Sequence, residues 1–75
     1  MKDLIIYLEE AAEFGKKVLV TLKDGTVEIG YPVSFFFDEG AEFEFDDDTG
    51  ESGFYIPMDD IEEVEVIEHD HRRVG

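Results

Sequence analysis

The chain has 75 residues, of which 21 are Asp or Glu and 6 are Lys or Arg, so its formal net charge at pH 7 is −15. It contains no Cys, which excludes disulfides, thiolate zinc sites and cysteine nucleophiles. This length allows one small domain with one core, and so acidic a surface disfavours nucleic acid and anionic lipid as partners.

The acidic residues dominate most of the chain. No Lys or Arg occurs between Lys23 and Arg72. The expected partners are therefore basic proteins, cations or uncharged apolar surfaces, while acidity that serves only solubility explains the composition equally well. No apolar run reaches the ~20 residues of a membrane span. Because acids also interrupt the N-terminus, where a signal peptide would be apolar, we expect a cytoplasmic protein.

Residues 3–14 are predicted to form a helix. Asp3 is the expected N-cap, because its carboxylate can accept hydrogen bonds from the free N–H groups of the first turn. Gly15 follows as the expected C′ residue in the left-handed region. The apolar stripe of this helix consists of Leu4, Leu8 and Ala11.

After Gly15 the apolar residues recur at every second position, which is the period of a β-strand. Asp24-Gly25 is a hairpin signal between the first two strands, and Gly30 with Pro32 predicts a bulge or bend in the long second strand. AEFEFD, residues 41–46, places apolar side chains on one face and carboxylates on the other. Strands are expected at about 17–23, 26–37, 41–46, 54–57 and 61–67, and a polar tail at 68–75.

These elements predict a mostly β protein with a single domain, residues 1–75. We expect an N-terminal helix followed by a five-stranded, strongly bent antiparallel small barrel. Closing the sheet on itself would bury the apolar face of short strands and remove most of the exposed edge.

The order of elements resembles that of the Sm-like proteins and, more loosely, the Src-homology-3-like small β-barrels. KVLVTLKDGTVEIGYPV, residues 17–33, resembles the opening strands of the Sm-like family, and IPMDDIEEVEVI, residues 56–67, resembles its closing turn and strand. The resemblance implies a small barrel, RNA binding, and assembly into a ring through the fourth strand.

The RNA-binding signatures of that family are lacking. Phe37-Asp38 fits the start of the first signature, but Glu42 stands about where the family has Asn, and Pro57-Met58 stands where the second signature has Arg-Gly. Pro57 also removes a backbone donor from the fourth strand. We therefore expect no RNA binding, and a monomer or homodimer rather than a ring, because a charge of −15 per subunit makes a ring repulsive.

No catalytic site, metal site or cofactor is expected. The acidic loop DDDTGE, residues 46–51, lacks the ligand spacing of an EF-hand and is best interpreted as a solvated loop. His69 and His71 could share a metal ion, but their place in the tail without a third His favours a frayed end. Adjacent acids such as Glu62-Glu63 point to opposite faces of a strand, so they do not form an acid–base pair.

Phe35, Phe36 and Phe37 are consecutive, so Phe36 must face away from the core side shared by the other two. Either the helix covers Phe36, or Phe36 belongs to an exposed aromatic patch ringed by acids; both alternatives are open. In the second case, the candidate partner-binding residues are Tyr31, Phe36, Asp38, Glu42 and Tyr55.

The favoured function is a non-catalytic protein-interaction module with a strongly acidic surface, whose partner is an unknown protein, with basic proteins as the first candidates. One alternative is an acidic mimic of nucleic acid that blocks a basic enzyme, which would need carboxylates spaced like phosphates along one face. The other is a divergent RNA-binding Sm-like protein.

Overall fold

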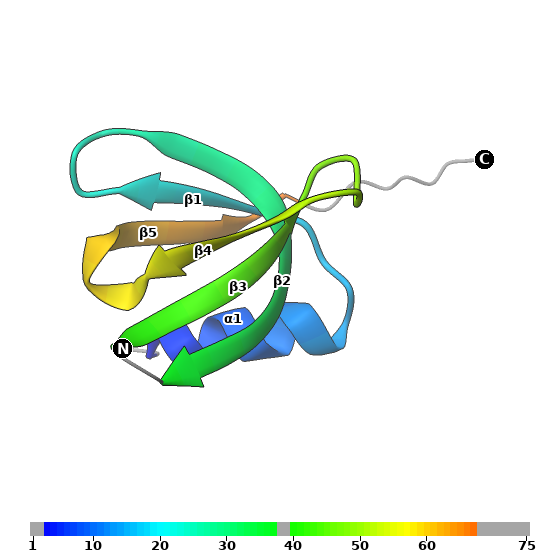
Figure 1. The fold of residues 1–75 in the computed structure, drawn as a ribbon, viewed down its shortest axis with the longest axis horizontal. Helices are drawn as coiled ribbons and strands as arrows, with labels where there is room; N and C mark the ends of the chain where they lie inside the picture. The colour runs from blue at the N-terminus through cyan, green and yellow to red at the C-terminus, as the bar shows by residue number, and fades with distance from the viewer. Residues whose placement is uncertain (1–2, 38–39, 68–75) are drawn as a thin grey trace.

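The structure, a computed structural model, describes residues 3–37 and 40–67. One α-helix precedes five strands that form a single antiparallel sheet (Figure 1). The predicted mostly β fold with an N-terminal helix is therefore confirmed. The elements are α1 (Leu4–Glu13), β1 (Val18–Leu22), β2 (Val27–Phe37), β3 (Ala41–Asp47), β4 (Gly53–Pro57), the 3-10 helix η1 (Met58–Asp60) and β5 (Ile61–Val66).

Helix α1 begins and ends where the sequence indicated, but only its end is capped as predicted. Asp3 holds the N-cap position with an extended backbone, and its carboxylate makes no capping hydrogen bond. At the other end Gly15 has a φ of 64°. Its N–H donates to the carbonyl of Ala12, and the N–H of Lys16 donates to the carbonyl of Ala11, which are the two hydrogen bonds of a Schellman motif.

The sheet has the strand order β4-β3-β2-β1-β5, so β4 and β5 are its two edges and it does not close on itself. The predicted barrel is not confirmed. At η1 the N–H of Lys23 donates to the carbonyl of Asp60 at 2.9 Å. This hydrogen bond joins η1 to the residue that follows β1, and β5 then pairs with β1.

The hairpin between β1 and β2 confirms the Asp24-Gly25 signal, although its loop is longer than two residues. The N–H of Leu22 donates to the carbonyl of Thr26, so three residues lie between the paired positions, and Gly25 has a φ of 93°. This is the three-residue hairpin with a left-handed residue at its end. The Asp24 carboxylate accepts from the N–H of Thr26 at 2.9 Å, which lowers the pKa of Asp24.

Strand β2 bends where Gly30 and Pro32 predicted an irregularity. Its register with β3 shifts between Pro32 and Ser34, which makes Val33 the extra residue of a bulge. Figure 1 shows β2 curving from its hairpin with β1 to the side of α1. Because of this bend, one strand pairs with β1 at its start and with β3 along the rest of its length.

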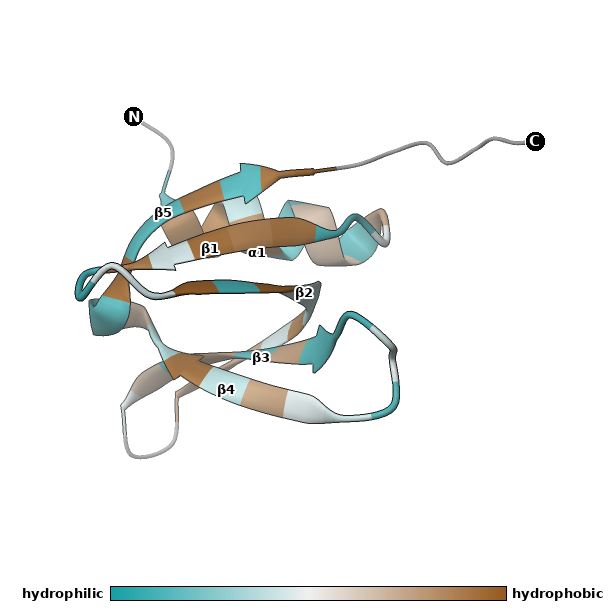
Figure 2. Ribbon diagram, turned by 90° about the horizontal axis from the view of Figure 1, so that it is seen from above, coloured by the Kyte–Doolittle hydropathy of each residue, from teal (hydrophilic) through white to brown (hydrophobic). Residues whose placement is uncertain are grey.

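The core lies between α1 and one face of the sheet. Leu8, Val18, Val20, Phe43 and Phe45 are almost completely buried, and Phe43 and Phe45 come from the alternating segment that the sequence assigned to the core. Figure 2 shows β1 hydrophobic along most of its length, whereas hydrophobic and hydrophilic residues interchange along β5. The opposite face of β2, β3 and β4 is left to solvent, and it carries most of the candidate site.

Candidate partner-binding surface

The face of β2, β3 and β4 that points away from the core is defined by the strand register. Three rows of paired residues cross it, and we refer to them together as the outer β3 face. The rows are Phe36–Glu42–Pro57, Ser34–Glu44–Tyr55 and Tyr31–Asp46–Gly53. The surface therefore has a line of carboxylates along β3, with aromatic side chains on both flanking strands.

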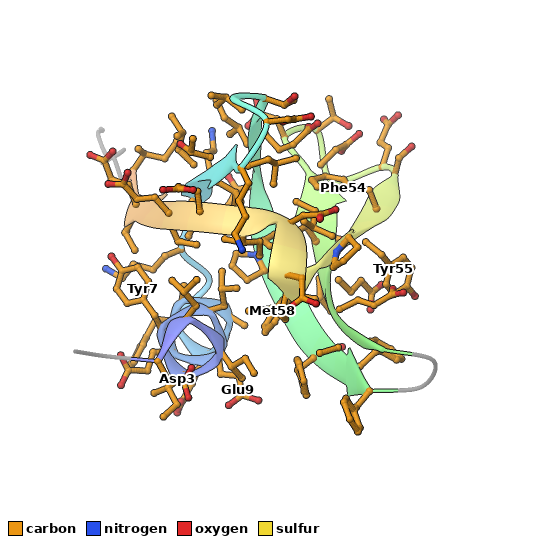
Figure 3. The ribbon with its side chains drawn as sticks, turned by 90° about the vertical axis from the view of Figure 1, so that its left-hand side faces the viewer. Asp3, Tyr7, Glu9, Phe54, Tyr55 and Met58 are labelled. Atoms are coloured by element: carbon orange, nitrogen blue, oxygen red, sulfur yellow. The ribbon has the colours of Figure 1, made fainter. Side chains whose placement is uncertain are left out.

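Two exposed aromatic rings meet across β3 at one end of this face. The ring centroids of Phe36 on β2 and Tyr55 on β4 are 5.5 Å apart, with an edge-to-face angle of 73°, which is a favoured arrangement of aromatic pairs. Phe36 remains 40% exposed and Tyr55 52% exposed. In Figure 3, Tyr55 lies on the side of β4 remote from α1. The two rings thus form an apolar patch on the solvent side of the sheet.

The carboxylates beneath these rings are held by the sheet and partly covered. Glu42 and Glu44 are each only half-buried, although both point away from the core. The hydroxyl of Ser34 donates a long hydrogen bond of 3.4 Å to the Glu44 carboxylate. Neither Glu42 nor Glu44 forms an ion pair within residues 3–37 and 40–67. The patch therefore combines aromatic rings with two carboxylates that have no cation from the described chain.

The other end of the outer β3 face has such a cation. The ammonium group of Lys17 lies 5.7 Å from the centroid of the Tyr31 ring and 2.7 Å from a carboxylate oxygen of Asp48. The hydrogen bond to Asp48 raises the pKa of Lys17. A cation here contacts both an aromatic face and a carboxylate, which is a favourable combination for an ammonium group.

The acidic loop between β3 and β4 is organised by its own hydrogen bonds. The Asp47 carboxylate accepts from the N–H and hydroxyl of Thr49 and from the N–H of Gly50. The hydrogen bond from the Thr49 side chain is the largest cause of the lowered pKa of Asp47. Among the residues that the structure describes, no three or more His, Asp or Glu side chains are grouped to hold a metal ion. Asp47 thus shapes a turn.

The structure brings together three of the five predicted site residues. Phe36, Glu42 and Tyr55 share one end of the outer β3 face, and Tyr31 lies at its other end with Lys17. Asp38 lies outside the described residues, as do His69 and His71. Of the two alternatives for Phe36, the exposed patch agrees with the structure, since the ring contacts Tyr55 and keeps 40% of its surface exposed.

Alternation with Phe36 placed Phe37 on the core side of the sheet, but Phe37 does not contribute to the core. It lies on the same side as Phe35, with ring centroids 6.4 Å apart and nearly parallel, but it is 78% exposed. Its register partner is Ala41, at the end of the β2–β3 ladder. Phe37 thus lies on the correct side for the core, but the described residues leave most of its ring uncovered.

Sequence reasoning missed Glu44 and Lys17 as members of the surface. The alternation of residues 41–46 already placed Glu44 on the same face as Glu42, so that signal was available. The contact of Lys17 with Tyr31 and Asp48 depends on three separate segments, and no local pattern indicates it.

Comparison with known proteins found no matching family model, no matching curated protein and no matching solved structure. Within the described ranges, no helix is both long and apolar enough to cross a membrane.

Proposed function

We propose that the protein is a non-catalytic interaction module that binds a basic segment of another protein through its outer β3 face. The observation that carries this proposal is the exposed Phe36–Tyr55 pair over Glu42 and Glu44. Aromatic side chains that are exposed in the free protein and can be enclosed by a partner are typical binding hot spots. Carboxylates beside them select a partner of opposite charge.

The Lys17 end of the face indicates how a partner would bind at the Phe36 end. Lys17 places its ammonium group over Tyr31 and against Asp48. At the Phe36 end the same types of group are present without a cation from the described residues. An Arg or Lys of the partner would stack on Tyr55 and meet Glu44, and its neighbouring apolar side chains would cover Phe36.

The half-buried state of Glu42 and Glu44 supports this function over a mimic of nucleic acid. A mimic must present bare carboxylates to a basic enzyme, because phosphates are recognised mainly by their charge. Here the two carboxylates stand beside an aromatic pair and are partly covered.

The scaffold that we propose is an Sm-like small barrel, supported by the helix, the five antiparallel strands and the bent second strand.

The test uses a short synthetic peptide with alternating Arg and Val and its acidic counterpart with Glu in place of Arg. We expect the basic peptide to shift the backbone amide NMR signals of Phe36, Glu42, Glu44 and Tyr55, and the acidic peptide to shift none of them. Binding should weaken between about 0.05 M and about 0.5 M salt, because the Debye length falls several-fold.

The double variant Phe36→Ala, Tyr55→Ala should weaken binding at least about 10-fold, as expected for paired hot-spot residues. The matched control is Phe14→Ala, which removes a ring that is 69% exposed at the end of α1. Equal affinity of the double variant and the wild type would refute the proposed surface. A gel-shift with oligouridylate at low salt tests the RNA-binding alternative, and we expect no shift.

A further inference from the structure

The outward edge of β4 carries backbone groups at Gly53 and Tyr55 that no described residue uses. The N–H of Asp47 donates to the carbonyl of Ser52 at 2.8 Å. Because hydrogen-bonded and non-hydrogen-bonded pairs alternate along an antiparallel ladder, Gly53, Tyr55 and Pro57 occupy non-hydrogen-bonded positions opposite β3. Their backbone groups point away from β3, to the open edge of the sheet.

Pro57 limits this edge to a short segment. Proline has no N–H, so the outward donors of this edge are those of Gly53 and Tyr55, and the carbonyls of the same two residues also point outward. Proline on an edge strand is a common protection against uncontrolled strand pairing. The edge is thus closed at the Pro57 end and open around Tyr55.

A groove runs along the same edge. It has a volume of about 470 Å³ and lies between β4, the end of β1, the start of β2 and η1. Its apolar lining includes Leu22, Phe54 and Ile56, and its carboxylates are those of Glu28 and Asp60. Figure 3 shows Phe54 on the inner side of β4, opposite to Tyr55.

Glu28 determines which kind of side chain this groove can accept. It pairs in register with Val20, a buried core residue, so its carboxylate is on the inner face of β2. Within the described part of the chain, neither Glu28 nor Asp60 forms an ion pair. An apolar group placed over Glu28 would desolvate an unpaired carboxylate, which is costly. A Lys or Arg can instead lay its aliphatic stem on Phe54 and direct its charge to the carboxylates.

We propose that the free edge of β4 accepts an extended segment of a basic partner as an additional strand, with an Arg or Lys side chain of that segment in the groove between Glu28 and Asp60. The inference rests on the proposed function only for the kind of partner. A second copy of this chain is a poor occupant, because both of its free edges bring like charges together. Its β5 edge carries Glu62, Glu63 and Glu65, its β4 edge has Glu28 and Asp60 beside it, and each copy has a net charge of −15.

Strand addition has a specific test on the peptide side. Main-chain hydrogen bonds supply much of the affinity in this mode, and only alternate residues of the added strand direct their N–H toward the edge. Two versions of the alternating Arg and Val peptide are therefore prepared, one N-methylated at every Arg and the other at every Val. We expect one version to lose binding and the other to retain it. Equal binding of both versions would overturn the inference.

The matching test on the protein side is the double variant Glu28→Gln, Asp60→Asn, with Glu62→Gln, Glu65→Gln as the control of equal charge on β5. We expect the groove variant to bind the unmodified peptide about 10-fold more weakly than the control does. In the wild-type complex, hydrogen exchange of the Tyr55 amide should slow markedly.

The outcomes separate the two proposals. Binding that depends on Phe36 and Tyr55, but not on Glu28, Asp60 or N-methylation, retains the proposed function and overturns the strand addition. Binding that depends on Glu28, Asp60 and N-methylation alone retains the strand addition and overturns the role of the aromatic pair. A peptide that does not bind the wild type at all overturns both.

Discussion

Gly30 has a neighbour that leaves no space for a side chain. It pairs with Val18 on β1 and with Asp47 on β3, at the point where β2 passes from one partner to the other. A Cβ atom at this position would lie 2.5 Å from the carbonyl oxygen of Asp46 and 3.2 Å from a ring carbon of Phe54. The first of these atoms belongs to the backbone of a paired strand, so it cannot move without displacing β3.

Gly30→Ala is therefore expected to lower the free energy of unfolding by about 1–3 kcal/mol, the usual cost of overpacking. Urea denaturation followed by circular dichroism measures it. The control is Gly53→Ala, whose Cβ would be 3.3 Å from the carbonyl oxygen of Phe45 and should cost less. A Gly30 variant as stable as the Gly53 variant would contradict the close contact seen here.

The sequence indicated that Gly30 and Pro32 interrupt a strand, because a glycine and a proline are each poor in a flat central strand. It did not indicate the reason for the glycine, which is the approach of Asp46 and Phe54 from the following strands. The same limit applies to the site. Local alternation separated Phe36 from the core, but its contact with Tyr55 depends on the pairing of β3 with both flanking strands.

At the scale of the elements, helix α1 packs on the apolar face of the sheet. Leu8 is fully buried and Ala11 almost so, whereas Ile6 on the same helix is 48% exposed. The two buried residues are three apart, so they occupy one side of the helix. The fully buried part of the helix is thus one narrow stripe, and Leu4 and Tyr7 pack against the core beside it while partly exposed.

Leu8→Ala should lower the free energy of unfolding by about 2–5 kcal/mol, as other leucine truncations in protein cores do. Ile6→Ala is the matched control, and its cost should be much smaller because its side chain is half-exposed. Urea denaturation compares the two variants. If Leu8→Ala is no more destabilising than Ile6→Ala, then α1 does not pack on the sheet through this stripe.

Periodicity predicted the elements well because it is a local property of the chain, but it does not determine whether the sheet closes, because closure is not local. The strands β4 and β5 are separated only by η1, yet they lie at opposite edges of the sheet. The pairing of β5 with β1 places Val64 opposite Val20 and Val66 opposite Val18. This pairing places Val18, Val20 and Val64 in the buried core, with Val66 partly buried beside them, and no single segment of the sequence reveals it.

At the scale of the whole molecule, the net charge of −15 is the main feature that solution conditions can modify. Within residues 3–37 and 40–67, the ammonium group of Lys17 forms an ion pair with Asp48 at 2.7 Å. On the opposite side of the charge balance, Glu62, Glu63 and Glu65 line one exposed edge of the sheet. Repulsion among so many like charges destabilises the compact state. Salt should therefore stabilise this protein, since it weakens much more repulsion than attraction.

We expect the melting temperature to rise by about 4–8 °C between low salt and about 0.5 M sodium chloride, which corresponds to about 1 kcal/mol for a domain of this size. Thermal unfolding followed by circular dichroism measures this change. Glu62→Gln, Glu65→Gln serves as the control, because removing two charges from the β5 edge should raise the melting temperature at low salt and reduce its dependence on salt. The opposite trend, a melting temperature that falls as salt is added, would mean that attractive ion pairs outweigh the repulsion. The acidic surface would then stabilise the fold directly instead of being available to a partner.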